Sequence, residues 1–86
     1  MQNDTDHLLR RILTDVLGLK PGQAEGFTAD TGLFGHLPEL DSMAIATLFA
    51  GIEDHFGVLF DDAELTGETL ETYGSLLALV RGKRTA

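Results

Sequence analysis

The side chain with the clearest opportunity for chemistry is the hydroxyl of Ser42. It follows Asp41, at a point where a loop gives way to the helical spacing of Ile45, Leu48 and Phe49. A short oxygen-bearing side chain at a helix start accepts hydrogen bonds from backbone N–H groups that the first turn leaves unpaired. The Asp41–Ser42 pair is therefore explained as an N-cap, and Ser42 gains a further role only if its surroundings support one.

The other reactive side chains form no constellation that could catalyse a reaction or hold a metal. His7, His36 and His55 fall in separate elements, and none belongs to a His-Glu-x-x-His pattern. A serine hydrolase needs Gly-x-Ser-x-Gly, but here Leu40 and Ala44 occupy the two glycine positions. The acidic residues of the last third lack the glycine and the ligand order of a calcium-binding loop. We therefore expect no metal site and no enzyme.

The size and cysteine content of the chain limit its chemistry further. Its 86 residues, 43% of them hydrophobic, predict one small domain over residues 1–86, with a modest core and no deep enclosed active site. The absence of cysteine excludes disulfides, and any thioester would need a thiol from an added group. No segment is typical of a membrane span or an export signal, so we expect a cytoplasmic protein.

Charge is spread unevenly along the chain. The formal net charge is −8, and between Pro21 and Val80 there are eleven Asp and Glu residues but no Lys or Arg. Such a surface repels nucleic acid and anionic membranes and speeds encounter with partners that carry basic patches. A merely well-solvated acidic protein is the alternative explanation.

Apolar spacing predicts an all-α fold of four helices, at about residues 4–17, 42–56, 61–66 and 69–81. Three are main helices and the third is short. The first places Arg10 and Arg11 on its wet side, and Thr69 is the candidate cap of the last. The apolar stripes comprise Leu8, Leu9, Ile12, Leu13, Val16 and Leu17, then Ile45, Leu48, Phe49, Ile52 and Phe56, then Leu70, Tyr73, Leu76, Leu77 and Val80.

A long loop separates the first two main helices. From Lys20 to Leu40 no period is sustained, and glycine and proline residues punctuate the segment. A loop of this length in a compact domain is either functional or contains a short turn of helix. We expect Phe34 and Leu37 to anchor it in the core, since a small domain needs all its large apolar side chains.

The sequence Leu40-Asp41-Ser42-Met43 resembles the modification site of acyl carrier proteins. The resemblance covers nearly the whole chain, because a first helix, a long loop, this motif, an acidic short helix and an apolar last helix follow in the family's order. It implies an acyl-carrier-like four-helix bundle. It also implies that Ser42 carries a covalent 4′-phosphopantetheine arm from coenzyme A, which holds an acyl group as a thioester.

Further roles follow from the resemblance alone. Asp41 would help to place the magnesium ion that a phosphopantetheinyl transferase uses when it attaches the arm. Met43 would touch partner enzymes, with an edge-of-core position as its alternative, and Glu53 and Asp54 would meet the basic patch of an acyl ligase or synthase of lipid or polyketide biosynthesis. The carrier is expected to act as a monomer.

Some residues depart from the best-known members of the family. Ala44 and Thr47 stand where fatty-acid-synthesis carriers often have acidic residues, which predicts a different choice of partner. The motif also lacks the Gly-Gly-His/Asp-Ser-Leu pattern of peptidyl carriers, and residues 32–43 look like carriers that accompany exosortase and polysaccharide gene clusters. Two alternatives stay open, namely a peptidyl or aminoacyl carrier and an unmodified acidic helical interaction module in which Ser42 is only a cap.

Overall fold

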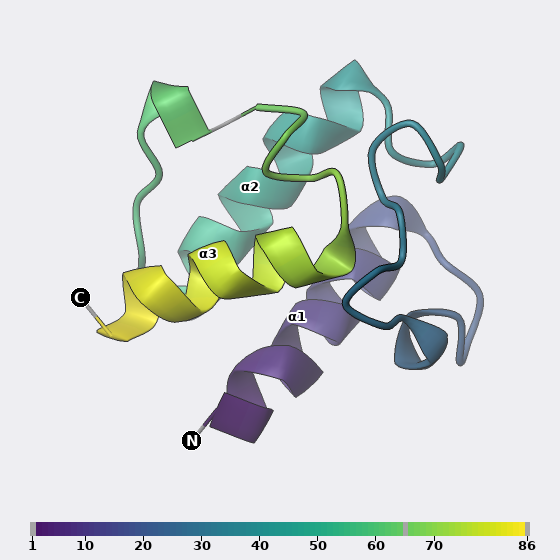
Figure 1. Ribbon diagram of the computed structural model, residues 1–86, viewed down its shortest axis with the longest axis horizontal. Helices are drawn as coiled ribbons and strands as arrows, with labels where there is room; N and C mark the ends of the chain where they lie inside the picture. Colours follow the sequence, from purple (N-terminus) through teal and green to yellow (C-terminus); the bar gives the residue numbers. More distant parts are fainter. Residues whose placement is uncertain (1, 65, 86) are drawn as a thin grey trace.

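A computed structural model describes residues 2–64 and 66–85 (Figure 1). Its helices are α1 (Gln2–Leu17), α2 (Ser42–Phe56) and α3 (Tyr73–Thr85), with short 3₁₀ helices η1 (Ala24–Gly26) and η2 (Asp62–Glu64) in the connections. Within these ranges no strand is formed, so the all-α prediction is confirmed. No described helix is both long and apolar enough to cross a membrane.

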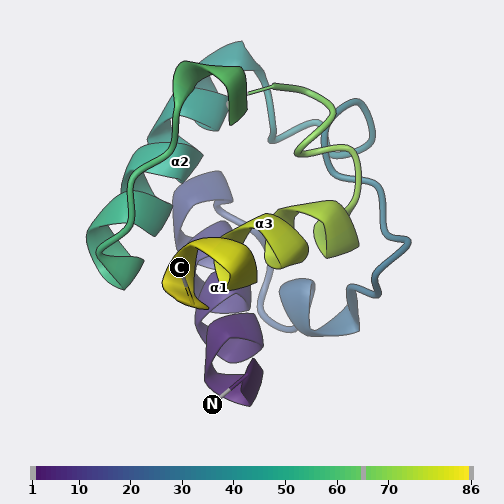
Figure 2. The ribbon, with the colours of Figure 1, turned by 60° about the vertical axis from the view of Figure 1, so that its left-hand side comes forward.

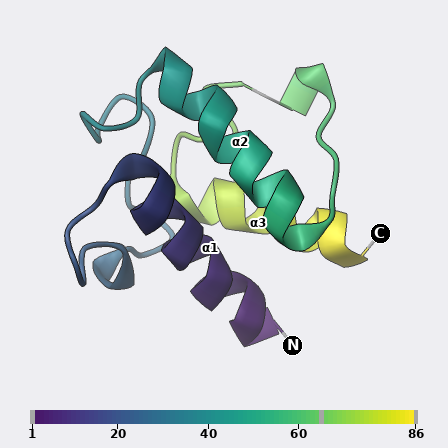
Figure 3. The same ribbon diagram turned by 180° about the vertical axis from the view of Figure 1, so that it is seen from behind.

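The three α-helices form a small bundle in which α1 contacts both of the others. Helices α1 and α2 lie side by side and antiparallel, and α3 crosses them (Figures 1 and 3). The long loop and the segment before α3 lie together on the side of the bundle away from the two chain termini (Figure 2). The core takes most of the expected apolar side chains, and its fully buried members include Leu9, Leu13, Leu33, Leu48, Ile52, Leu70, Tyr73, Leu76 and Val80.

Local capping signals fix both ends of α2. The Asp41 side chain accepts a hydrogen bond from the Ala44 N–H at the start, and Gly57, in the left-handed conformation, donates its N–H to the Glu53 carbonyl at the end. The helix accordingly spans Ser42–Phe56, the range that the sequence pattern predicts.

The last helix does not begin where its sequence pattern suggests. Helix α3 starts at Tyr73 rather than at residue 69 and extends to Thr85. Thr69 therefore does not cap it. Thr72 does, because its hydroxyl accepts a hydrogen bond from the Ser75 N–H at 3.1 Å while the Ser75 hydroxyl accepts one from the Thr72 N–H at 3.2 Å.

Tertiary pairing selects the later start. Gly32 and Thr72 form an isolated antiparallel bridge, and the Tyr73 N–H donates to the Thr31 carbonyl at 2.8 Å. Gly74 passes so close to the long loop that a Cβ there would lie 2.7 Å from the Ala29 carbonyl oxygen. Exchanging one threonine cap for another changes the free energy little, whereas burying a large side chain such as Tyr73 is worth roughly 1.5–3 kcal/mol.

Arg10 does not lie on the wet face of α1, contrary to the prediction from its spacing. Its guanidinium lies 4.6 Å from the ring centre of Tyr73, pairs with Asp6 at 2.9 Å, and donates to the carbonyls of Ala24 and Phe27 at 2.6 and 2.9 Å. Its long apolar stem lets a charged head reach these partners from a half-buried position. Arg10 therefore joins α1 to the loop around η1.

The long loop contains the turn of helix that its length suggested, as η1. Leu33 is fully buried and Leu37 is half-buried, as expected for anchors. Phe34, however, is 39% exposed, so its prediction as a core residue is wrong. Its N–H donates to the Leu70 carbonyl at 2.8 Å, which holds the backbone beside the segment before α3 and leaves the ring at the surface.

The short acidic helix is the 3₁₀ turn η2, within the segment predicted at residues 61–66. Leu65, which the pattern placed in that helix, lies outside the described residues. Glu64 pairs with Lys83 of α3 at 2.7 Å, and this hydrogen bond lowers the pKa of Glu64 and raises that of Lys83. The Phe60 ring meets Phe49 edge-on, with ring centres 4.9 Å apart. These contacts attach the connection to both α2 and α3.

Candidate functional site

Ser42 is the first residue of α2, and its side chain is exposed. The capping role that the sequence allowed to either residue of the pair belongs to Asp41, whose Oδ1 accepts from the Ala44 N–H at 2.8 Å. Among the residues that the structure describes, the Ser42 hydroxyl has no hydrogen-bond partner. The hydroxyl is thus free to react with a group that arrives from solvent.

The chain has one other serine, and it is differently placed. The Ser75 hydroxyl oxygen lies 2.8 Å from the carbonyl oxygens of both Thr69 and Thr72, which share its one proton, and it also accepts from the Thr72 N–H. Ser75 is half-buried. Of the two serines, only Ser42 therefore presents an accessible and unengaged hydroxyl.

The start of α2 can also accommodate a phosphate group. The aligned peptide dipoles of a helix place partial positive charge at its N-terminus, which favours an anion attached there. The Asp41 carboxylate bonds to the Ala44 N–H in the first turn of α2, and the side chain of Ser42 stays exposed. The site fits an exposed phosphodiester better than a buried reaction centre.

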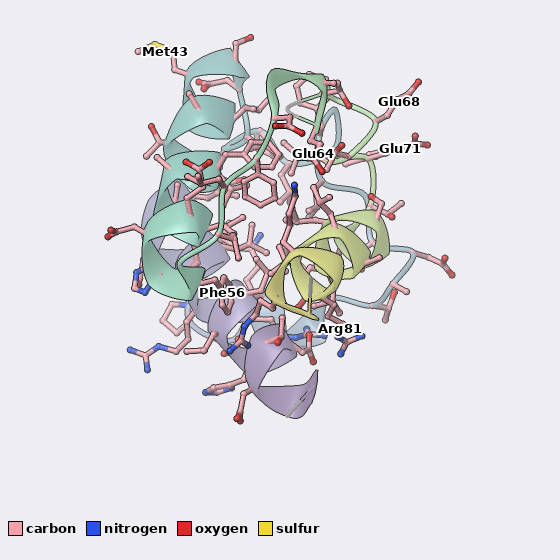
Figure 4. The ribbon with its side chains drawn as sticks, turned by 90° about the vertical axis from the view of Figure 1, so that its left-hand side faces the viewer. Met43, Phe56, Glu64, Glu68, Glu71 and Arg81 are labelled. Atoms are coloured by element: carbon pink, nitrogen blue, oxygen red, sulfur yellow. The ribbon has the colours of Figure 1, made fainter. Side chains whose placement is uncertain are left out.

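Met43 lies next to Ser42 and points away from the bundle (Figure 4). It is 82% exposed, so the alternative edge-of-core position is wrong. Ala46, Thr47 and Ala50 follow it on exposed positions of α2. The side chains at the centre of this face are small and uncharged, so Met43 is the largest apolar side chain on it.

The two acidic residues expected to meet a partner differ in the structure. Asp54 is exposed near the end of α2. Glu53 is half-buried, and its Oε2 accepts a hydrogen bond from the Phe60 N–H at 2.9 Å. The Glu53 carboxylate therefore holds the connection after α2, a role that sequence reasoning missed because its partner is a backbone group in an irregular segment.

No cluster of three or more metal-ligating side chains is found in the described part of the chain. His36 and His55 are exposed in different elements, as their spacing predicted. Asp41 alone could supply one oxygen to a metal ion whose other ligands come from elsewhere.

A shallow open hollow of about 410 Å³ precedes the α2 start. It is lined by Phe34, Gly35, His36, Leu37, Pro38 and Leu40. Sequence reasoning missed it, because it assigned Phe34 and Leu37 to the core. The turn-forming Gly35 and Pro38 were the only local signal that this stretch lies at the surface.

Comparisons with known proteins agree with this geometry. A family model described as a phosphopantetheine attachment site matches residues 7–81. The solution NMR structure of a holo acyl carrier protein from Nitrosomonas europaea is 38% identical, with a TM-score of 0.85 over 94% of this chain and 96% of that one. No curated protein sequence matches significantly.

Proposed function

Because the chain belongs to the phosphopantetheine-binding acyl carrier family, we propose that Ser42 is the residue that carries its prosthetic arm. The observation that supports this most directly is the exposed and unengaged hydroxyl at the start of α2. The second serine, Ser75, is half-buried and fully engaged in hydrogen bonds.

The family assignment explains the chemistry of the chain. It is an acyl carrier with a covalent 4′-phosphopantetheine group and is not itself an enzyme. The arm supplies the thiol that a cysteine-free sequence lacks, so an acyl group can be held as a thioester. Neither the unmodified interaction module nor the peptidyl carrier is favoured by these relatives.

Attachment would use the residues at the α2 start as follows. The Ser42 oxygen forms a bond to the phosphorus of coenzyme A that bears the pantetheine, and the adenosine-containing phosphate leaves. The hydroxyl proton passes to a base of the transferase. The Asp41 carboxylate, held beside the helix by the Ala44 N–H, supplies an oxygen toward the transferase's magnesium ion.

Partner enzymes are implied by a carrier role, and their contacts form the finer part of the proposal. Exposed Met43 and Asp54 are the proposed contact residues, whereas Glu53 contributes less because its carboxylate bonds to Phe60. The acidic middle of the sequence favours a transferase and an acyl ligase or synthase with basic docking patches. The monomeric state, the cytoplasmic location and the exosortase or polysaccharide context stay predictions.

The intact mass of the protein tests the attachment site. The chain is incubated with coenzyme A, magnesium and a broad-specificity phosphopantetheinyl transferase, beside Ser42→Ala and Ser75→Ala. We expect a phosphopantetheine-sized gain in the wild type and in Ser75→Ala, and none in Ser42→Ala. A gain in folded Ser42→Ala would place the arm elsewhere.

A further inference from the structure

We propose that the hollow lined by residues 34–38 and Leu40 is a resting place for the phosphopantetheine arm. This inference rests on the proposed attachment at Ser42. The hollow's last lining residue, Leu40, directly precedes Asp41, so an arm attached at Ser42 begins beside the hollow. Occupation needs no movement of the helices.

The wall of the hollow is fixed by backbone hydrogen bonds. The N–H groups of His36 and Leu37 both donate to the Leu33 carbonyl, at 3.1 and 2.9 Å, and the Leu40 N–H donates to the Leu37 carbonyl at 3.1 Å. Phe34 is joined in turn to the Leu70 carbonyl at 2.8 Å. A preformed wall loses little conformational entropy when a chain settles on it.

His36 is held in this wall by the absence of a side chain at Gly32. A Cβ at Gly32 would lie 2.2 Å from the His36 ring, so only glycine lets the imidazole pack against the backbone there. The ring is nevertheless exposed on its other side. Its nitrogens can therefore donate or accept a hydrogen bond at the hollow.

The lining suits the chemistry of the arm. A pantetheine chain alternates amide groups with methyl and methylene groups, and the hollow combines an imidazole with the apolar surfaces of Phe34, Leu37 and Pro38. Phe34 is a large aromatic side chain left partly exposed, which costs free energy unless something covers it.

A neighbouring hollow provides an internal comparison. It is lined by residues 20–23 and 37–39, and its charged lining residues are Lys20 and Glu39. It contains no aromatic side chain and does not include Leu40. We therefore assign the arm to the hollow with Phe34 and His36.

A spin label on the arm tests the assignment. Because the chain has no cysteine, a maleimide nitroxide reacts only with the thiol of the arm. Loading is verified first by intact mass, and intensities of ¹⁵N-labelled backbone amides are then compared before and after the nitroxide is reduced. We expect residues 34–37 to lose most of their intensity and residues 20–23 to lose much less.

Matched variants separate the hollow from general flexibility of the arm. In His36→Ala, the nitroxide should cause a smaller loss of amide signal intensity at residues 34–37. In His55→Ala, which removes an exposed histidine at the other end of α2, this loss of intensity should be unchanged. Equal loss at both hollows, or loss centred on residues 58–64, would overturn the resting place and leave attachment at Ser42 intact. Failure of the wild type to load would instead overturn the proposed function itself.

Discussion

The starts of α2 and α3 use the same capping chemistry with opposite consequences for a serine. At α2 an aspartate before the helix takes the capping role, and Ser42 at the first helical position keeps a free hydroxyl. At α3 Thr72 caps, and Ser75 in the first turn returns its hydroxyl to the residues ahead of the helix. Both helices are capped by the residue before their first turn, so a serine near a helix start is available for chemistry only where its own hydroxyl takes no part in the cap, as at Ser42.

The two starts also differ in how they are supported. The start of α3 is buried, with Tyr73 only 1% exposed and its hydroxyl bonded to the Asp6 side chain on α1. The start of α2 faces solvent at Asp41, Ser42 and Met43. The start of α3 is therefore held by buried contacts, whereas the start of α2 is accessible to other molecules.

The largest expected effect comes from removing the charge of Asp41 while keeping its cap. In Asp41→Asn the amide oxygen can still accept from the Ala44 N–H, so α2 should persist. Loading by the transferase should nevertheless slow by roughly 10- to 100-fold, as when a group that orients a metal site is lost. Initial rates of mass gain measure this, with Asp15→Asn, at an exposed position of α1, as the control. An unchanged rate would show that Asp41 is only a cap.

A second prediction concerns pH and the buried start of α3. Burial, and next the hydrogen bond to Asp6, raises the pKa of Tyr73. A group whose pKa is raised by folding adds its full share to the free energy of unfolding below its unfolded pKa, about 10 for tyrosine. This stabilisation is lost as the pH rises beyond that value. The free energy of unfolding should therefore fall above pH 10, by at most about 1.4 kcal/mol per pH unit.

The variant Tyr73→Phe isolates this effect in urea titrations at several pH values. It should be less stable than the wild type at neutral pH because Asp6 loses the hydrogen bond from Tyr73 and keeps only the one from Arg10, yet its stability should vary less above pH 10. Burial opposes the ionisation of Asp6, but the hydrogen bonds from Tyr73 and Arg10 outweigh it and hold the carboxyl's pKa below its usual value. If the free energy of unfolding fell equally steeply with pH in both proteins, Tyr73 would not be the cause of the fall.

The smallest expected effect compares the two serines by stability. Ser75→Ala removes the donor that the Thr69 and Thr72 carbonyls share and the acceptor of the Thr72 N–H, and should cost about 1 kcal/mol. Ser42→Ala removes no hydrogen bond within the described residues and should change the free energy of unfolding by less than about 0.5 kcal/mol. Equal losses would mean that Ser42 also supports its helix.

Much of the fold could be predicted where the signals were local. The bounds of α2 follow from Asp41 and Gly57, each of which acts within one turn of the helix end. The start of α3 could not be predicted, because Thr69 and Thr72 are both suitable caps. The choice between them is made by the pairing of Thr72 with Gly32 in the distant loop.

The residues that form the site could be predicted from the sequence, but the contacts of their side chains could not. The motif pointed to Asp41, Ser42 and Met43, and the family resemblance pointed to Glu53 as a partner contact. Periodicity does not show that a long side chain bends back to a partner, as Glu53 does to Phe60 and Arg10 does to the η1 loop. It also gave no sign that Phe34 stays at the surface.

The bridge between Gly32 and Thr72 has a consequence for the order of folding. It joins residues that are far apart in the chain, and α3 takes its first turn from that pairing. Closing such a long segment costs entropy before any contact repays it, so α1 with its loop should form first and act as the template. The caps of α2 come instead from Asp41 and Gly57, which adjoin the helix in the chain, so the surroundings of the Ser42 hydroxyl depend on no such distant pairing.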